Sequence, residues 1–202
     1  MAGVASLIHG SAEPAGRGIT IGTPRVYGLY ASYLFRGRRR AAFRTLLSES
    51  GARPGDHVLD VGSGTGYFAR LLAGTVGARG SVEGIDASPE MVAYATRRAR
   101  RRSNCRFLAG TAESLPYPDG RVDVAVSSFV IHHLTEEAQL PALREMGRVL
   151  RPGGTLLVAE VPTGDDMGHP APPLDGALAE AGFTAIRSGE VGRWMRFAVG
   201  TS

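Results

Sequence analysis

Short apolar runs alternate with amphipathic stretches along most of the chain, and this alternation predicts the elements. The apolar runs predict strands at 57–61, 81–85, 106–109, 122–127 and 155–161. Before and between them, apolar residues recur at helical spacing, which predicts helices at 38–50, 66–74, 88–101 and 141–150. We expect a turn at 151–154, where the sequence Arg-Pro-Gly-Gly precedes the fifth strand.

The order of these elements indicates how the sheet is built. Strands separated by helices favour a parallel, doubly wound sheet with right-handed crossovers. After a further helix at 173–181, two last strands are expected at 183–188 and 194–199. Only residues 189–193 separate them, too few for a crossover helix, so they should form an antiparallel hairpin. The predicted fold is α/β, with a mostly parallel seven-stranded sheet and an antiparallel C-terminal hairpin.

Composition agrees with one globular domain, since 43% of the 202 residues are hydrophobic and 21% are charged. No apolar stretch approaches the roughly 18 residues that would cross a membrane, and the N-terminus lacks the layout of a signal peptide. The single cysteine, Cys105, excludes an internal disulfide and suits a reducing cytosol, so a cytoplasmic protein is expected. We expect Cys105 to be a buried, inert thiol.

Positive charge gathers in two arginine clusters, within 36–40 and 97–102, and the formal net charge is +4. A basic patch could attract nucleic acid. The second cluster, however, falls at the end of a predicted helix, where positive side chains interact favourably with the helix dipole. We therefore do not expect a nucleic-acid partner.

The strongest chemical signal is a glycine-rich turn between the first strand and its helix. Gly62, Gly64 and Gly66 alternate directly after an apolar strand that ends in an acid. Closely spaced glycines let the chain turn sharply and let a ligand lie against bare backbone. Tyr67 stands where a dinucleotide fingerprint needs its third glycine, which argues against a nicotinamide cofactor and favours S-adenosylmethionine.

Four segments, in this order and spacing, resemble the class I S-adenosylmethionine-dependent methyltransferases. They are Val58–Gly66, Gly84–Ser88, Gly110–Pro116 and Arg148–Gly154. The chain is most similar to the group that includes the ubiquinone/menaquinone biosynthesis C-methyltransferases and many small-molecule enzymes. The resemblance covers 40–161 well and 176–200 loosely. It implies a Rossmann-like cofactor-binding domain at 38–202, with residues 1–37 as an N-terminal arm or flap.

The resemblance also assigns the residues that hold the cofactor. Asp60 would face the cationic amino-acid end, and the three glycines with Thr65 would wrap the methionine part. Asp86, followed by Ala87, ends the second strand and would accept both ribose hydroxyls. The alternative for Asp60 is a plain turn acid at the end of a strand, and the alternative for Asp86 is an ordinary acid at the approach to a helix.

Three consecutive residues, Thr111, Ala112 and Glu113, would border the adenine. Many relatives carry an acidic or amide side chain in place of Thr111, and Glu113 is equally well explained as a solvated loop acid. Ser128 would contact the cofactor from the end of the fourth strand, or be a simple strand-end serine.

The implied reaction transfers a methyl group from S-adenosylmethionine to an oxygen, carbon or nitrogen atom of a small molecule, leaving S-adenosylhomocysteine. In-line displacement needs no protein nucleophile, only alignment of acceptor, methyl and sulfur. An acceptor proton needs a base, and His132 and His133 are the candidates, with a packing role as the alternative. We expect no metal.

Other functions stay open. An RNA or other macromolecular methyltransferase is one, although Ser127-Ser128-Phe129-Val130 lacks the Asn/Asp-Pro-Pro-aromatic motif of enzymes that methylate base amines. Another is a cofactor-binding protein that needs a partner for activity, because residues 162–172 offer little of the lid that relatives insert there. A homodimer or a partner protein would then complete the lid.

Overall fold

A computed structural model of the chain describes residues 23–24, 37–161, 172–193 and 195–202. The expected arm at 1–37 and the short stretch at 162–172 therefore lie almost entirely outside the described residues. The helices are α3 (Arg39–Glu49), α4 (Tyr67–Val76), α5 (Pro89–Ala99), the 3₁₀ turn η1 (Ile131–His133), α6 (Glu136–Val149) and α7 (Leu174–Glu180). The strands are β1 (His57–Val61), β2 (Ser81–Asp86), β3 (Cys105–Ala109), β4 (Val122–Ser128), β5 (Leu150–Glu160), β6 (Thr184–Val191) and β7 (Met195–Thr201).

These strands form one seven-stranded sheet in the order β3-β2-β1-β4-β5-β7-β6. The four pairings from β3 to β5 are parallel. Strand β7 runs antiparallel to both β5 and β6, between which it lies. The predicted doubly wound sheet with a C-terminal hairpin is confirmed.

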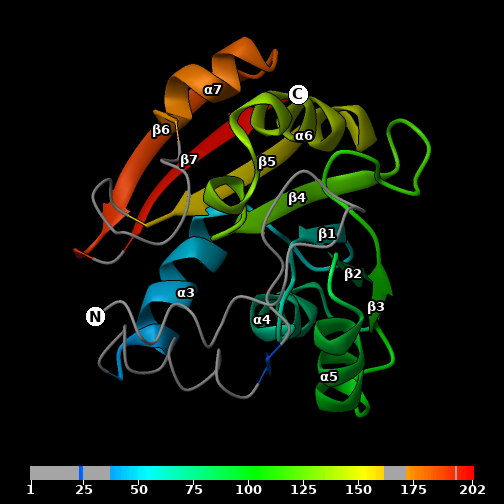
Figure 1. The fold of residues 1–202 in the computed structure, drawn as a ribbon. Coiled ribbons are helices and arrows are strands. Elements are labelled where there is room, and N and C mark those ends of the chain that lie inside the picture. The colour runs from blue at the N-terminus through cyan, green and yellow to red at the C-terminus, as the bar shows by residue number, and fades with distance from the viewer. Residues whose placement is uncertain (1–22, 25–36, 162–171, 194) are drawn as a thin grey trace.

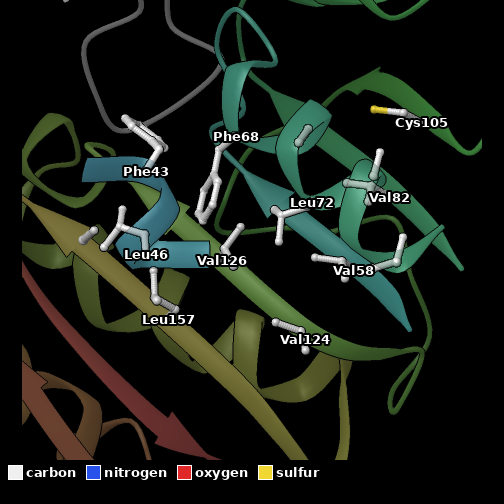
Figure 2. Packing of buried hydrophobic residues seen from close by; sticks show 14 of the residues in the cluster. Phe43, Leu46, Val58, Phe68, Leu72, Val82, Cys105, Val124, Val126 and Leu157 are labelled. Atoms are coloured by element: carbon white, nitrogen blue, oxygen red, sulfur yellow. The ribbon is translucent and has the colours of Figure 1, made fainter. Parts of the chain in front are cut away.

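Helices cover both faces of the sheet (Figure 1). Buried side chains of α3, α4 and α5 form one apolar cluster with one face, and those of α6 and α7 form a second cluster with the other. Figure 2 shows Phe68 of α4 directed toward Val126 of β4 in the first cluster, to which Phe43 of α3 also belongs. Cys105 is buried in that cluster, as the sequence predicted.

Two predicted boundaries differ from the structure by the most residues. Helix α6 begins at Glu136, five residues before the predicted start, and holds Pro141 in its interior. Burial of Ala138 and Ala142 in the core outweighs the backbone hydrogen bond that the proline removes.

The expected turn at 151–154 lies inside β5 instead. The pairing of β4 with β5 shifts between Val122 and Val124, so the extra residues bulge. Gly153 supplies the positive φ (+76°) that this bulge requires. The sequence motif therefore does bend the chain, but without ending the strand.

Candidate active site

The glycine turn lies at the carboxyl edge of the sheet, between β1 and α4. The backbone N–H groups of Gly62 and Ser63 donate to the Ile85 carbonyl at 2.8 and 2.9 Å, which ties the turn to the end of β2. Gly62, Gly64 and Gly66 all have positive φ, between +51° and +71°. The turn is thus preformed by its own backbone and by β2.

The three glycines are needed for different reasons. A Cβ on Gly62 would lie 2.1 Å from Val130 Cγ2, and one on Gly66 would lie 2.6 Å from Phe107 Cζ. The missing Cβ atoms of Gly62 and Gly66 therefore leave room for the side chains of Val130 and Phe107 to pack against the turn. A Cβ on Gly64 would meet nothing described within 4 Å. Gly64 is the position where bare backbone is open to a ligand.

Asp86 links this turn to the next helix. Its Oδ2 accepts from the Gly64 N–H at 2.7 Å and its Oδ1 from the Ser88 N–H at 2.9 Å. Burial raises the pKa of Asp86, and these two N–H groups offset part of the rise. Each carboxylate oxygen retains a further lone pair, so the side chain can still accept hydroxyl donors.

Asp60 is buried at the end of β1 with only 1% of its surface exposed. Among the described residues, neither carboxyl oxygen has a partner at hydrogen-bond geometry. Burial raises the pKa of Asp60 to about 7, the Ala69 backbone N–H offsets part of the rise, and the Asp86 carboxylate adds to it. A buried carboxyl without a partner is costly, so Asp60 is suited to accept N–H groups or to face a positive charge.

The segment after β3 lies beside Asp86. Gly110 donates its N–H to the Asp86 carbonyl at 3.1 Å. Thr111 then forms an isolated antiparallel bridge with Ser114, so 111–114 is a closed turn. Ala112 is buried, whereas Thr111 and Glu113 are half-buried. The structure thus brings the three predicted adenine-side residues to the same edge as the two aspartates.

The two histidines lie in η1, directly after β4. His132 is buried (4% exposed), and its Nδ1 lies 2.5 Å from Oε2 of Glu160, which is fully buried at the end of β5. The other oxygen of Glu160 accepts the N–H groups of Val130 and Ile131 at 3.1 and 2.8 Å. Glu160 was not predicted from the sequence, although it is an acid at the end of an apolar strand, as Asp60 and Asp86 are.

A strained residue turns the chain from Ser128, the half-buried last residue of β4, into η1. Phe129 has a φ of +60°, a backbone conformation that residues other than glycine rarely adopt. Its N–H donates to the Ala159 carbonyl at 2.8 Å, and its ring packs against Phe43 with centroids 6.3 Å apart. Such strain is typical of functional sites. Here it places Val130 against the glycine turn and His132 against Glu160.

Comparisons with known proteins agree with this geometry. A family model described as a methyltransferase domain matches residues 58–154. The crystal structure of an S-adenosylmethionine-dependent methyltransferase from Aquifex aeolicus is 30% identical, with a TM-score of 0.69, over 79% of this chain and 88% of that one. This chain belongs to the S-adenosylmethionine-dependent methyltransferases.

Relatives of this methyltransferase chain include larger proteins. The ubiquinone/menaquinone biosynthesis C-methyltransferase of Ectopseudomonas mendocina is 38% identical over 66% of this chain and 53% of its own length. An uncharacterized 37.1 kDa protein in a transposon of Streptomyces fradiae is 34% identical over 93% of this chain and 54% of its own length. The chain therefore spans about half the length of the curated relatives it matches.

The residues present fit the cofactor of this methyltransferase family. The unpartnered Asp60 suits a cationic amino-acid group, Gly64 leaves open backbone, and Asp86 retains acceptor capacity for hydroxyls. Among the described residues, no group of three or more His, Cys, Asp or Glu side chains could hold a metal ion. Within that part of the chain, no helix is both long and apolar enough to cross a membrane.

Proposed function

We propose that this chain binds S-adenosylmethionine at the carboxyl edge of its sheet and transfers the methyl group to an oxygen, carbon or nitrogen atom of a small molecule. Family membership supports the reaction class. The observation that carries the site is Asp60, a buried carboxyl without a hydrogen-bond partner among the described residues, beside a preformed glycine turn. Residues 38–202 form the cofactor-binding domain in this proposal, with 1–37 as its flap.

Each cofactor part has a matching group in this proposal. Asp60 receives the amino-acid end, while Gly62, Gly64, Thr65 and Gly66 surround the methionine chain. Asp86, next to Ala87, accepts the ribose hydroxyls. Thr111, Ala112 and Glu113 border the adenine, and Ser128 contacts the cofactor from β4. S-adenosylmethionine supplies the electrophilic methyl group.

The pair His132–Glu160 is the base in this proposal. When Nδ1–H of His132 donates to Glu160, the ring's Nε2 is the atom that can take a proton. The buried Glu160 carboxylate would stabilise the imidazolium that forms, since opposite charges interact strongly away from water. The His133 ring lies beside this ring, tilted by 45° with centroids 4.0 Å apart, and His133 is the second candidate. A purely structural pair is the alternative, because Glu160 also holds the η1 backbone.

Aromatic side chains beside the glycine turn support a small, largely apolar acceptor. Tyr67 begins α4, and its ring meets Phe43 edge-on with centroids 5.2 Å apart. The Arg39 guanidinium lies 4.1 Å from the centroid of the Tyr67 ring. Phe129 completes this cluster from the end of β4. In this proposal the half-buried rings of Tyr67 and Phe129 orient the acceptor and exclude water.

The second candidate function is a methyltransferase that needs a second subunit or a partner protein to complete its acceptor site. A methyltransferase of similar fold (23% identical, TM-score 0.69) has been solved in complex with the Haloferax volcanii Trm112 methyltransferase activator. The likeness shows the fold alone. It nevertheless makes a second copy or a partner protein a concrete way to complete the acceptor site, and activity that appears only on addition of a partner would favour this alternative.

Calorimetry with S-adenosylhomocysteine tests the cofactor site directly. The wild-type protein should bind with micromolar affinity, about −8 kcal/mol. Asp86→Ala should weaken binding, whereas Glu180→Gln, a charge change on the exposed end of α7, should not. Absence of binding by the wild type would refute the proposal.

The base is tested separately, once an acceptor has been found by mass spectrometry of methylated products. His132→Gln should lower kcat while leaving S-adenosylhomocysteine affinity unchanged. An unaltered kcat would assign His132 to packing.

A further inference from the structure

The turn 111–114 is continued by a loop that is bound to the far end of α6. Glu145 Oε1 accepts the Leu115 N–H at 2.8 Å. Arg148 donates to the carbonyls of Leu115 and Tyr117 at 3.3 and 2.9 Å, and to Asp119 Oδ1 at 2.6 Å. Gly120 returns its N–H to the Arg148 carbonyl at 3.1 Å. The last turn of α6 therefore binds this loop at both ends.

The two helix residues also hold each other. Arg148 Nε lies 2.7 Å from Glu145 Oε2, and Nη2 lies 2.7 Å from Oε1, so the two side chains form a bidentate pair. Hydrogen bonds to Arg148 lower the pKa of Glu145, and those to Glu145 and Asp119 raise the pKa of Arg148. Both groups therefore stay charged across the physiological range. The planar fork of arginine fixes the direction of all its bonds, which a lysine cannot reproduce.

A third anchor ties the loop to the sheet. Tyr117 donates its hydroxyl hydrogen to Glu83 Oε2 at 2.6 Å. Glu83 is buried in β2 and also accepts from Arg106 at 2.6 Å. Burial, followed by the bond to Glu83, raises the pKa of Tyr117, so the hydroxyl remains a donor. Glu83 lies three residues before Asp86 on the same strand, which links the loop to the strand that carries the ribose acid.

Little freedom remains between these anchors and the adenine side. The bridge from Thr111 to Ser114 closes the turn, and Leu115, the next residue, is bound by α6 through both its N–H and its carbonyl. The side chains of Ala112 and Leu115 are buried in the same apolar cluster. The position of the turn 111–114 is thus set by the position of Leu115.

We propose that Arg148 and Glu145, with Tyr117 as a second support, are positioning residues for the adenine of the cofactor. They act through Leu115 and do not touch the ligand. This inference rests on the proposed function, because it assumes that the turn 111–114 borders the adenine. Removing the hydrogen bonds of Arg148, Glu145 or Tyr117 should lower the affinity for any ligand that carries adenine. It should not change the rate of the methyl-transfer step.

Binding of two ligands separates this role from general support of the fold. S-adenosylhomocysteine carries both the adenosine part and the amino-acid end, whereas 5′-methylthioadenosine carries the adenosine part with a methylthio group and no amino-acid end. Arg148→Gln should weaken both by the same factor, about 5- to 30-fold. Asp60→Asn should weaken S-adenosylhomocysteine only. Arg144→Gln is the matched control, since Arg144 is exposed on the same helix.

Two further variants keep the test decisive if Arg148→Gln does not fold. Arg148→Lys keeps the charge but loses the fork, and Tyr117→Phe removes only the bond to Glu83. Each should raise the KM for S-adenosylmethionine with kcat at saturating cofactor unchanged. Equal affinities of the folded variants and wild type for both ligands would overturn the positioning role while leaving the proposed function intact. Failure of the wild type to bind either ligand would refute the proposed function itself.

Discussion

The raised pKa of Asp60 predicts that cofactor binding depends on pH around neutrality. In the ligand-free protein, burial raises the pKa of this carboxyl to about 7, so it is mostly protonated at pH 6. A cationic amino-acid group favours the ionised form, so binding must displace the proton below pH 7. Affinity should therefore rise as pH rises through 7.

The size of the effect follows from this pKa. At pH 6 a group with a pKa of 7 is protonated about ten times more often than it is ionised, whereas at pH 8 it is almost fully ionised. The dissociation constant for S-adenosylhomocysteine should therefore be about tenfold larger at pH 6 than at pH 8, or about 1.4 kcal/mol. Nearly one proton should leave on binding at pH 6, and almost none at pH 8.

Calorimetry in two buffers of different ionisation enthalpy measures both quantities. Asp60→Asn keeps the shape of the side chain but cannot ionise, so its affinity should be weaker and its proton release should vanish. This variant also controls for titration of the ligand's own amine. The same affinity at pH 6 and 8 in the wild type, or the same pH slope in Asp60→Asn, would refute the assignment of Asp60 to the amino-acid end.

In the ligand-free protein, the free energy of unfolding should fall as pH rises, whereas the affinity for the cofactor rises. Because the pKa of Asp60 is higher in the folded state than the ordinary value of 3.8, the folded state binds the proton more tightly. Its contribution to stability is present at low pH and is lost as pH rises from about 4 to 7. Urea unfolding across this range should show a slope that Asp60→Asn removes.

Further predictions follow from burial and close packing. Gly62→Ala should lower the free energy of unfolding by about 1–3 kcal/mol and by more than Gly64→Ala does, because both place alanine at positive φ but only the Gly62 Cβ would overlap Val130, whereas Gly64→Ala should have the larger effect on cofactor affinity. Both are measured by urea unfolding and calorimetry, and the reverse ranking would contradict the roles given to the two glycines. Burial raises the pKa of the Cys105 thiol to about 11, so iodoacetamide at pH 8 should label it only in urea, as mass spectrometry would show. Leu157→Ala should destabilise the protein by about 2–5 kcal/mol in the same urea assay, since this core side chain is fully buried.

Much of the fold could be predicted because its signals are local. Strand β1 has the predicted bounds, 57–61, since an apolar run between a turn and a glycine motif leaves little choice. Ser88 was predicted to begin a helix, and its Oγ accepts the Met91 N–H at 3.2 Å. The start of α6 was predicted too late, because Pro141 is a local signal for a helix start and the core that overrides it is not local.

The candidate site also has features that local sequence predicts and features that depend on long-range contacts. Asp60 and Asp86 were predictable, because an acid that ends a parallel strand must lie at the carboxyl edge of the sheet. The structure adds a role for Gly62 and Gly66 that the sequence did not predict, since the missing Cβ atoms leave room for Val130 and Phe107. These contacts join segments far apart in sequence, which no spacing rule anticipates.

By itself, the sequence determined which segments are strands and helices and which acids end the strands, because those properties depend on neighbours a few residues away. Only the tertiary structure decided that Glu160 binds His132 and that Arg148 holds the loop at Leu115. Residues 28 and 33 positions apart form these bonds. Such pairs meet only when the sheet order and the packing of α6 bring their backbones together, and neither is encoded in a local pattern.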